Sequence, residues 1–222
     1  MKLADFEASS KVNALVKAAG EEIRAAQAAE KVAKDTLDKT PRPASQADFK
    51  GMAALQAAEG AYRNARLHAQ QVLNRQTDQA RWALRDLRGE LENEITTAFT
   101  MDAAAVDPTV LALLETGTLS AADYQKIVDD SLAAQNYSTA RLAGAFAGKQ
   151  AKRTGSDSAD SLKMTEIAQS VERMAAGRDL LAAFDVASGL AVRCIEHPLM
   201  FGRWEELSTP LFEAEDTEAA AS

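Results

Sequence analysis

The sequence predicts an all-α protein: a long, coiled-coil-like antiparallel helical hairpin followed by a compact bundle of shorter helices. Residues 45–99 contain no proline, and their apolar side chains recur at gaps of three, four and seven residues, which is the spacing of one helix face. No stretch shows the apolar–polar alternation of a half-buried strand. The predicted apolar stripe consists of Leu55, Tyr62, Ala69, Leu73, Ala80, Leu84, Leu87, Leu91 and Ile95.

The composition favours extended helices that share narrow seams. Hydrophobic residues make up 46% of the 222 residues, but aromatic residues only 5%. Much of the apolar content is alanine, which forms helices well and buries little area. We therefore expect thin contacts between helices rather than a thick core.

Charge and cysteine content exclude several classes of protein. A net charge of -8 argues against general nucleic-acid binding, which needs a basic surface, and against docking on an anionic membrane. The single cysteine, Cys194, excludes an internal disulfide and a multi-cysteine metal site. The first residues lack the apolar segment of a signal peptide, and no run approaches the roughly 18 apolar residues of a membrane span. We expect a soluble, intracellular protein without a cofactor or metal.

The first helix is expected over residues 3–38, where two sets of positions repeat every seven residues. Pro41 and Pro43 then break the helix, and Ser45 is expected to cap the next one, with Asp48 completing a capping box. A short connection between long helices implies an antiparallel hairpin. The repeating positions are Val12, Ala19, Ala26 and Ala33, and Val16, Ile23, Glu30 and Leu37.

The second helix is expected to extend past the first. If Leu37 lies beside Phe49, Leu3 reaches roughly Trp82. Larger apolar residues gather in the part of the second helix that extends farther, from Trp82 to Phe99. We expect this end to dock onto the C-terminal half of the chain.

The remaining sequence predicts short helices between strong turn signals. Asp107 and Pro108 begin a helix that Gly117 ends with a left-handed cap. Ser120, with Asp123 three residues on, begins the next helix. After a break at Asn136, Ser138 or Thr139 is expected to cap another.

Residues 149–161 are polar and are expected to form a loop. One helix should follow from Leu162 and another over residues 178–196, with Gly177 either a cap or an interior glycine. A short helical turn is expected within residues 201–211. The predicted domains are a helical hairpin over residues 1–100, a compact helical domain over 101–212 and a disordered acidic tail over 213–222.

The predicted interaction residues lie on the second helix. Leu84, Leu87 and Leu91 belong to its stripe and are expected to dock it. Arginines flank the stripe within about a third of the helix circumference, at 100° per residue. They either bind an anionic partner or pair with Glu21, Glu22 or Asp35 of the first helix. These arginines are Arg63, Arg66, Arg81, Arg85 and Arg88, of which Arg81, Arg85 and Arg88 are predicted to set the charge register.

No pattern singles out a catalytic residue. Cys194 and His197 lie at the end of a helix, where the dipole disfavours a thiolate, so a small buried cysteine is the favoured interpretation. His68 lacks a metal-binding neighbour at helical spacing. Residues 144–150 lack the spacing and the hydroxyl residue of a phosphate loop. Carboxylates are plentiful but none stands out as a pair, so we expect no enzyme activity.

One segment resembles a known class of proteins. Residues 113–124, Leu-Leu-Glu-Thr-Gly-Thr-Leu-Ser-Ala-Ala-Asp-Tyr, and residues 136–142, Asn-Tyr-Ser-Thr-Ala-Arg-Leu, resemble small helical proteins encoded among the structural genes of tailed bacteriophages. The resemblance covers about residues 107–147, and Ala140 stands where a larger apolar residue is usual. It implies a role in the virion or its assembly, with no catalytic residues.

We therefore expect a non-enzymatic structural or assembly protein of a bacteriophage particle, located in the virion or in the host cytoplasm during assembly. Its expected partner is a second copy or another virion protein, because long helices with small seam residues commonly self-associate. The alternative is a cytoplasmic helical adaptor or regulator that binds another protein. The acidic residues Glu213, Glu215, Asp216 and Glu218 either solubilise the chain or bind a basic partner.

Overall fold

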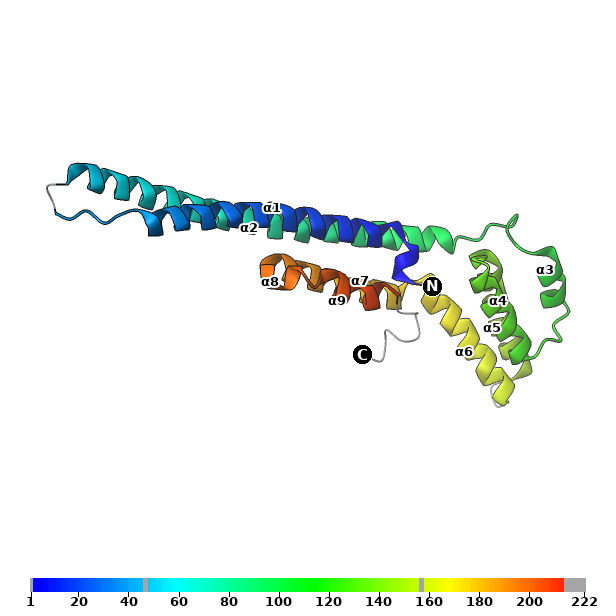
Figure 1. Ribbon diagram of the computed structural model, residues 1–222. Helices are drawn as coiled ribbons and strands as arrows, with labels where there is room; N and C mark the ends of the chain where they lie inside the picture. Colours follow the sequence, from blue (N-terminus) through cyan, green and yellow to red (C-terminus); the bar gives the residue numbers. More distant parts are fainter. Residues whose placement is uncertain (1, 46–47, 156–157, 214–222) are drawn as a thin grey trace. The chain divides into compact units, whose positions relative to one another are not determined.

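The computed structural model describes residues 2–45, 48–155 and 158–213, and every regular element within them is helical (Figure 1). The all-α class is therefore confirmed for the described residues. Apart from Glu213, the predicted tail lies outside them. The elements are the 3₁₀ helix η1 (Leu3–Asp5) and the α-helices α1 (Glu7–Lys39), α2 (Phe49–Ala98), α3 (Pro108–Glu115), α4 (Ala121–Ala133), α5 (Tyr137–Thr154), α6 (Ala159–Ala175), α7 (Arg178–Glu196), α8 (Pro198–Phe201) and α9 (Trp204–Glu213).

The described residues form two compact units that do not follow the chain order. One contains residues 2–7, 88–185 and 211–213, and the other contains residues 8–87 and 186–210. The divisions fall inside α1, α2, α7 and α9. Residues 186–210 group with residues 8–87 because they pack against α1, and the domain boundary near residue 100 stays a prediction.

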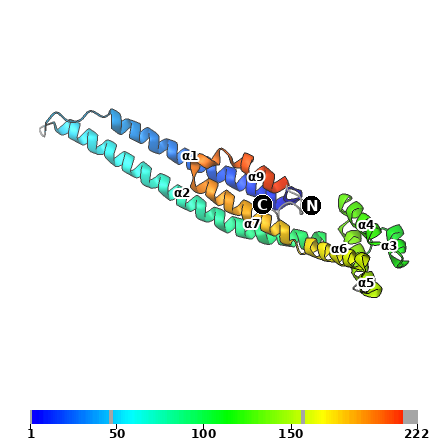
Figure 2. The same ribbon diagram turned by 90° about the horizontal axis from the view of Figure 1, so that it is seen from below.

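In the unit of residues 8–87 and 186–210, α1 and α2 lie side by side in both views (Figures 1 and 2). Glu22 Oε2 accepts hydrogen bonds from Arg75 at 2.8 Å and from Gln76 at 2.6 Å. The register expected from the sequence would have put Glu22 near Asn64. The residue numbers of the observed pairs sum to 97 and 98 rather than 86, which puts Lys39 opposite roughly residue 58, so the first turns of α2 extend beyond the end of α1.

The buried faces of α1 and α2 both follow the three- and four-residue spacing of a single helix face. In α1 the buried apolar residues run from Ala8 to Ala26, and in the part of α2 that belongs to the same unit they run from Ala69 to Leu87, apart from Ala58. Buried apolar side chains are therefore concentrated in these parts of the two helices.

The C-terminal segment covers part of α1 within this unit. Trp204 Nε1 donates a hydrogen bond to Asn13 Oδ1 at 2.9 Å. The Phe201 ring packs on Gly20, where a β-carbon would collide with it, and the Arg24 guanidinium lies 4.3 Å from the centre of the same ring. These contacts make residues 13–24 of α1 the covered part of the helix.

Beyond residue 26 of α1, the contact between α1 and α2 buries few side chains. None of the described residues between 27 and 57 is buried. We call residues 27–39 of α1 and 49–68 of α2 the arm, within which Ala58 is the buried residue. Most helix stability in proteins comes from packing an apolar face, and the arm has little such packing.

In the unit of residues 2–7, 88–185 and 211–213, helices α3 to α6 share one apolar core. Helices α5 and α6 approach each other closely. A β-carbon on Gly144 would lie 2.9 Å from the Val171 β-carbon, and one on Gly148 would lie 3.1 Å from that of Ala168. The buried core residues are Leu114, Ala121, Tyr124, Val128, Ala143, Ala147, Ala151, Met164, Ile167 and Val171.

Several predicted helix boundaries are confirmed. The Asp107 side chain caps α3 by accepting from the amide of Thr109 at 2.7 Å, with Pro108 in the first turn. Ser120 and Asp123 form the predicted capping box of α4. Gly117 and Gly177 have φ of 65° and 62°, the left-handed conformation that glycine adopts at little cost, so Gly177 is a cap.

Other boundaries differ from the prediction. Asp48, rather than Ser45, lies at the start of α2 and accepts from the Gly51 amide at 2.9 Å. Asn136, rather than Ser138 or Thr139, caps α5 by accepting from the Thr139 amide. The expected loop over residues 149–161 is shorter, because α5 continues to Thr154 and α6 begins at Ala159.

Candidate interaction surfaces

The three predicted docking leucines of α2 are buried. Their exposed fractions are 4% for Leu84, 8% for Leu87 and 0% for Leu91. Their side chains therefore pack within the chain, and an interaction with a partner through them stays a prediction. Trp82, which was expected to pack with them, is 64% exposed.

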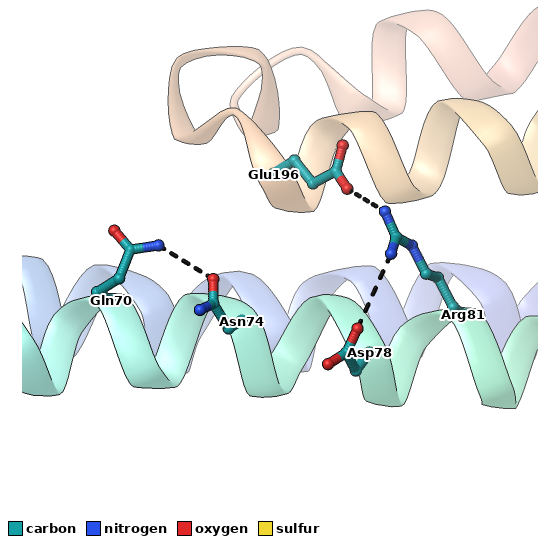
Figure 3. A network of polar contacts seen from close by, with 5 residues as sticks. All are labelled: Gln70, Asn74, Asp78, Arg81 and Glu196. Atoms are coloured by element: carbon teal, nitrogen blue, oxygen red, sulfur yellow. Dashed lines mark hydrogen bonds and ion pairs between the residues drawn. The ribbon is translucent and has the colours of Figure 1, made fainter.

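The three predicted arginines have partners within their own units. Arg81 donates to Glu196 Oε1 at 2.6 Å and lies 3.9 Å from Asp78 (Figure 3). In the same unit the Arg85 guanidinium stacks 4.9 Å from the centre of the Trp82 ring. The two carboxylates offset the positive charge that a partner would meet at Arg81, whereas stacking on Trp82 leaves the charge of Arg85 in place.

Arg88, in the other unit, donates from Nε to Asp185 Oδ1 at 2.8 Å and lies 3.9 Å from Glu92. The hydrogen bond and the charge of Asp185 raise the pKa of the Arg88 guanidinium. Its ion pair with Asp185 is partly exposed, and such pairs stabilise a fold by at most about 1 kcal/mol. The carboxylates that meet the predicted arginines thus lie on α2 and α7, whereas Glu22 of α1 pairs with Arg75.

The break before α5 has a structural task. Asn136 caps α5 and donates from Nδ2 to the carbonyl of Ala105 at 2.9 Å. The Ser138 hydroxyl accepts from the amide of Asp102 at 3.1 Å, and the Thr139 hydroxyl accepts from that of Asp107 at 3.3 Å. These bonds hold residues 102–107 against the start of α5.

The C-terminal end of α2 is also hydrogen-bonded to the first turns of α5. The Arg141 guanidinium donates to the Phe99 carbonyl at 2.6 Å, which satisfies one of the carbonyls left open at a helix C-terminus. The Phe99 and Tyr137 rings lie 5.0 Å apart. The sequence predicted only a helix break at Asn136. It did not predict these hydrogen bonds, because they join residues that are about 35 positions apart.

A groove between α5 and α6 is a site that the sequence did not predict. It has a volume of about 680 Å³. Its floor is made of glycine and alanine, and four charged side chains stand around it. We call this the basic groove, and it is lined by Arg141, Gly144, Ala145, Gly148, Lys149, Lys152, Ala168, Val171, Glu172, Ala175 and Ala176.

The basic groove exists because α5 carries two glycines one turn apart. Gly144 and Gly148 allow α6 to approach closely, and the small residues beside them leave space at the surface. Residues 144–150, which lack the pattern of a phosphate loop, lie inside α5. The geometry is therefore that of a helix–helix groove.

The other chemically interesting residues form no site within the described residues. Cys194 is fully buried, and burial raises the pKa of its thiol. His68 and His197 are exposed. The residues that the structure describes contain no group of three or more His, Cys, Asp or Glu side chains placed to hold a metal ion.

None of the helices in the described part of the chain is long and apolar enough to cross a membrane. Comparison of the chain with models of protein families, with curated proteins and with solved structures finds no match.

Proposed function

We propose that this chain is a non-enzymatic structural or assembly protein of a bacteriophage particle, and that it acts through contacts between helices. In this proposal the α1–α2 pair is a hairpin whose arm packs against a second copy of the chain. The protein then works in the virion, or in the host cytoplasm during assembly. The resemblance of residues 107–147 to proteins of phage structural genes supports this setting.

The observation that carries the proposal is the thin packing of the arm. Two helices with little buried surface gain stability when further helices cover them. Three large apolar side chains of the arm are more than half exposed: Val32 at 65%, Phe49 at 80% and Leu67 at 56%.

Charge favours a second copy as the occupant. The arm contains six basic and four acidic residues, so its net charge is +2. The whole chain has a net charge of -8, which leaves -10 for the remainder. Oppositely charged surfaces attract and steer encounter, so the arm of one copy is drawn to the acidic remainder of another.

The alternative function is that of a helical adaptor or regulator that binds one other protein. The basic groove favours it, because a groove with a defined charge suits one partner segment of the opposite charge. An adaptor of this kind would be a stable monomer in the absence of its partner.

The mass of the intact protein in solution tests the proposal. Sedimentation and native mass spectrometry over a hundredfold range of concentration should show self-association that Leu67→Glu weakens. The matched control is Val186→Glu, because Val186 is 59% exposed and lies outside the arm. A monomer at every concentration would contradict the proposal and favour the adaptor, and association that survives Leu67→Glu unchanged would remove the arm from it.

A further inference from the structure

The basic groove has three cations on one helix face and one carboxylate on the other helix. Arg141, Lys149 and Lys152 come from α5, and Glu172 comes from α6. The three cations are eight and three residues apart, which places them along one side of α5 over about three turns. The groove therefore presents a positive edge along its length.

The positive edge is open for binding. Arg141, Lys149 and Lys152 are exposed, and no carboxylate of the described residues forms an ion pair with Lys149 or Lys152. Arg141 is fixed in place by its bond to the Phe99 carbonyl, which leaves other N–H groups to donate. Lys149 lies over the Phe146 ring at 5.8 Å from its centre.

The small residues at the floor of the groove determine which segments can pack closely in it. Gly144, Ala145 and Gly148 on one side face Ala168, Ala175 and Ala176 on the other. Small side chains on both sides permit the backbone of a third segment to approach, as they do between closely packed helices. A fitting occupant is acidic and has small side chains of its own.

The chain contains a segment of this chemistry. Residues 213–222 read Glu-Ala-Glu-Asp-Thr-Glu-Ala-Ala-Ala-Ser, with four acidic residues, four alanines and no basic residue. Four negative charges complement the three cations of the groove. Every side chain in the segment that is not acidic is small.

We propose that the basic groove binds the acidic segment 213–222 of a second copy of this chain. This inference rests on the proposed self-association and assigns to it a second contact. The groove and the segment are different surfaces, so each copy can offer its groove to one neighbour and its segment to another. Such head-to-tail contacts close into rings or continue as filaments, whereas a mutual exchange between two copies closes as a dimer.

Binding of a synthetic peptide tests the chemistry independently of self-association. A fluorescent peptide of residues 211–222 should bind the chain truncated after Glu213, and Lys149→Glu/Lys152→Glu should weaken binding at least tenfold. Lys163→Glu is the matched control, because Lys163 is an exposed α6 lysine outside the groove. A peptide with Glu215, Asp216 and Glu218 replaced by glutamine should bind at least tenfold more weakly. Equal binding to both groove and control variants would overturn the inference.

Mixing two defective chains separates a contact between copies from one within a copy. The truncated chain keeps the groove, and Lys149→Glu/Lys152→Glu keeps the segment. A one-to-one mixture should cross-link between the intact segment of one chain and the intact groove of the other. Wild-type cross-links between segment and groove that form only within one chain would overturn the inference. If wild-type self-association is unchanged in both variants, the inference fails while the proposed function stands.

Discussion

Ser120 and Asp123 show how single residues fix where the helices begin. The Ser120 side chain accepts from the Asp123 amide, and Asp123 Oδ2 accepts from the Ser120 amide at 2.9 Å and from its hydroxyl at 2.6 Å. The hydrogen bonds from Ser120 lower the pKa of the Asp123 carboxyl. A lowered pKa in the folded chain means that the ionised carboxylate stabilises the fold.

Ser120→Ala should therefore destabilise the chain by about 1 kcal/mol at pH 7, because capping side chains contribute roughly that much. The contribution of ionised Asp123 is present above the unfolded pKa, about 3.9, and is lost as the pH falls through the lower folded value. The deficit of the variant should thus shrink in urea unfolding at pH 3 compared with pH 7. An equal deficit at both pH values would contradict the role given to the carboxylate.

Cys194 should be unreactive in the folded chain. It is fully buried, and burial raises its thiol pKa, so little thiolate is available to attack a reagent. A disulfide reagent at pH 8 should label Cys194 at least a hundredfold faster in urea than under native conditions. Fast native labelling would show that this part of α7 opens readily.

At the scale of the helices, the contact between α5 and α6 depends on Gly144. Gly144→Ala would place a β-carbon 2.9 Å from that of Val171, and such overpacking costs roughly 1–3 kcal/mol. Gly89→Ala is the matched control, since nothing lies within 4 Å of its added β-carbon. It should stabilise the helix by about 1 kcal/mol. Thermal melts that move the same way in both variants would contradict the close approach.

The buried stripe of α2 makes a second prediction at this scale. Leu91 is fully buried, and Leu91→Ala should cost roughly 2–5 kcal/mol by leaving a cavity. Leu113→Ala, at a position that is 46% exposed, should change the free energy of unfolding by less than about 0.5 kcal/mol. Urea unfolding of both variants measures the difference, and similar values would place Leu91 outside the core.

Helix boundaries were predicted from the sequence where one or two neighbouring residues decide them. Asp107, Gly117 and Ser120 act on amides or dihedral angles within a few residues, so their roles can be read locally. The start of α2 was misplaced because Ser45 and Asp48 are both good caps and the sequence does not rank them. The cap of α5 was misplaced because Asn136 competed with two hydroxyl residues beside it.

Features that join distant residues were not predictable in the same way. The pairing of Glu22 with Arg75 depends on the path of the connection between α1 and α2, because the first turns of α2 extend beyond the end of α1. The basic groove forms because α6 packs against Gly144 and Gly148. In the sequence these two glycines suggested only a poor match to a phosphate loop. Phe201 packs on Gly20, which is 181 positions away in the sequence. No local pattern could therefore predict that residues 186–210 pack against α1.

At the scale of the whole molecule, the arm is the feature on which the proposed function depends. It belongs to helices that the sequence predicted as long, yet it lacks the burial that normally stabilises such helices. Among its residues Ala58 is the buried one, so α1 and α2 alone leave most of the arm uncovered. A second copy would supply the missing contacts. Association would then slow hydrogen exchange in the arm rather than in the chain as a whole.

Hydrogen exchange measured against protein concentration tests this claim most directly. Backbone amides of residues 27–39 and 49–68 should exchange quickly in dilute protein and at least tenfold more slowly when the concentration is raised a hundredfold. Amides of α5 and α6 should be protected at both concentrations by their own core. Arm amides that exchange at the same rate at every concentration would contradict the account.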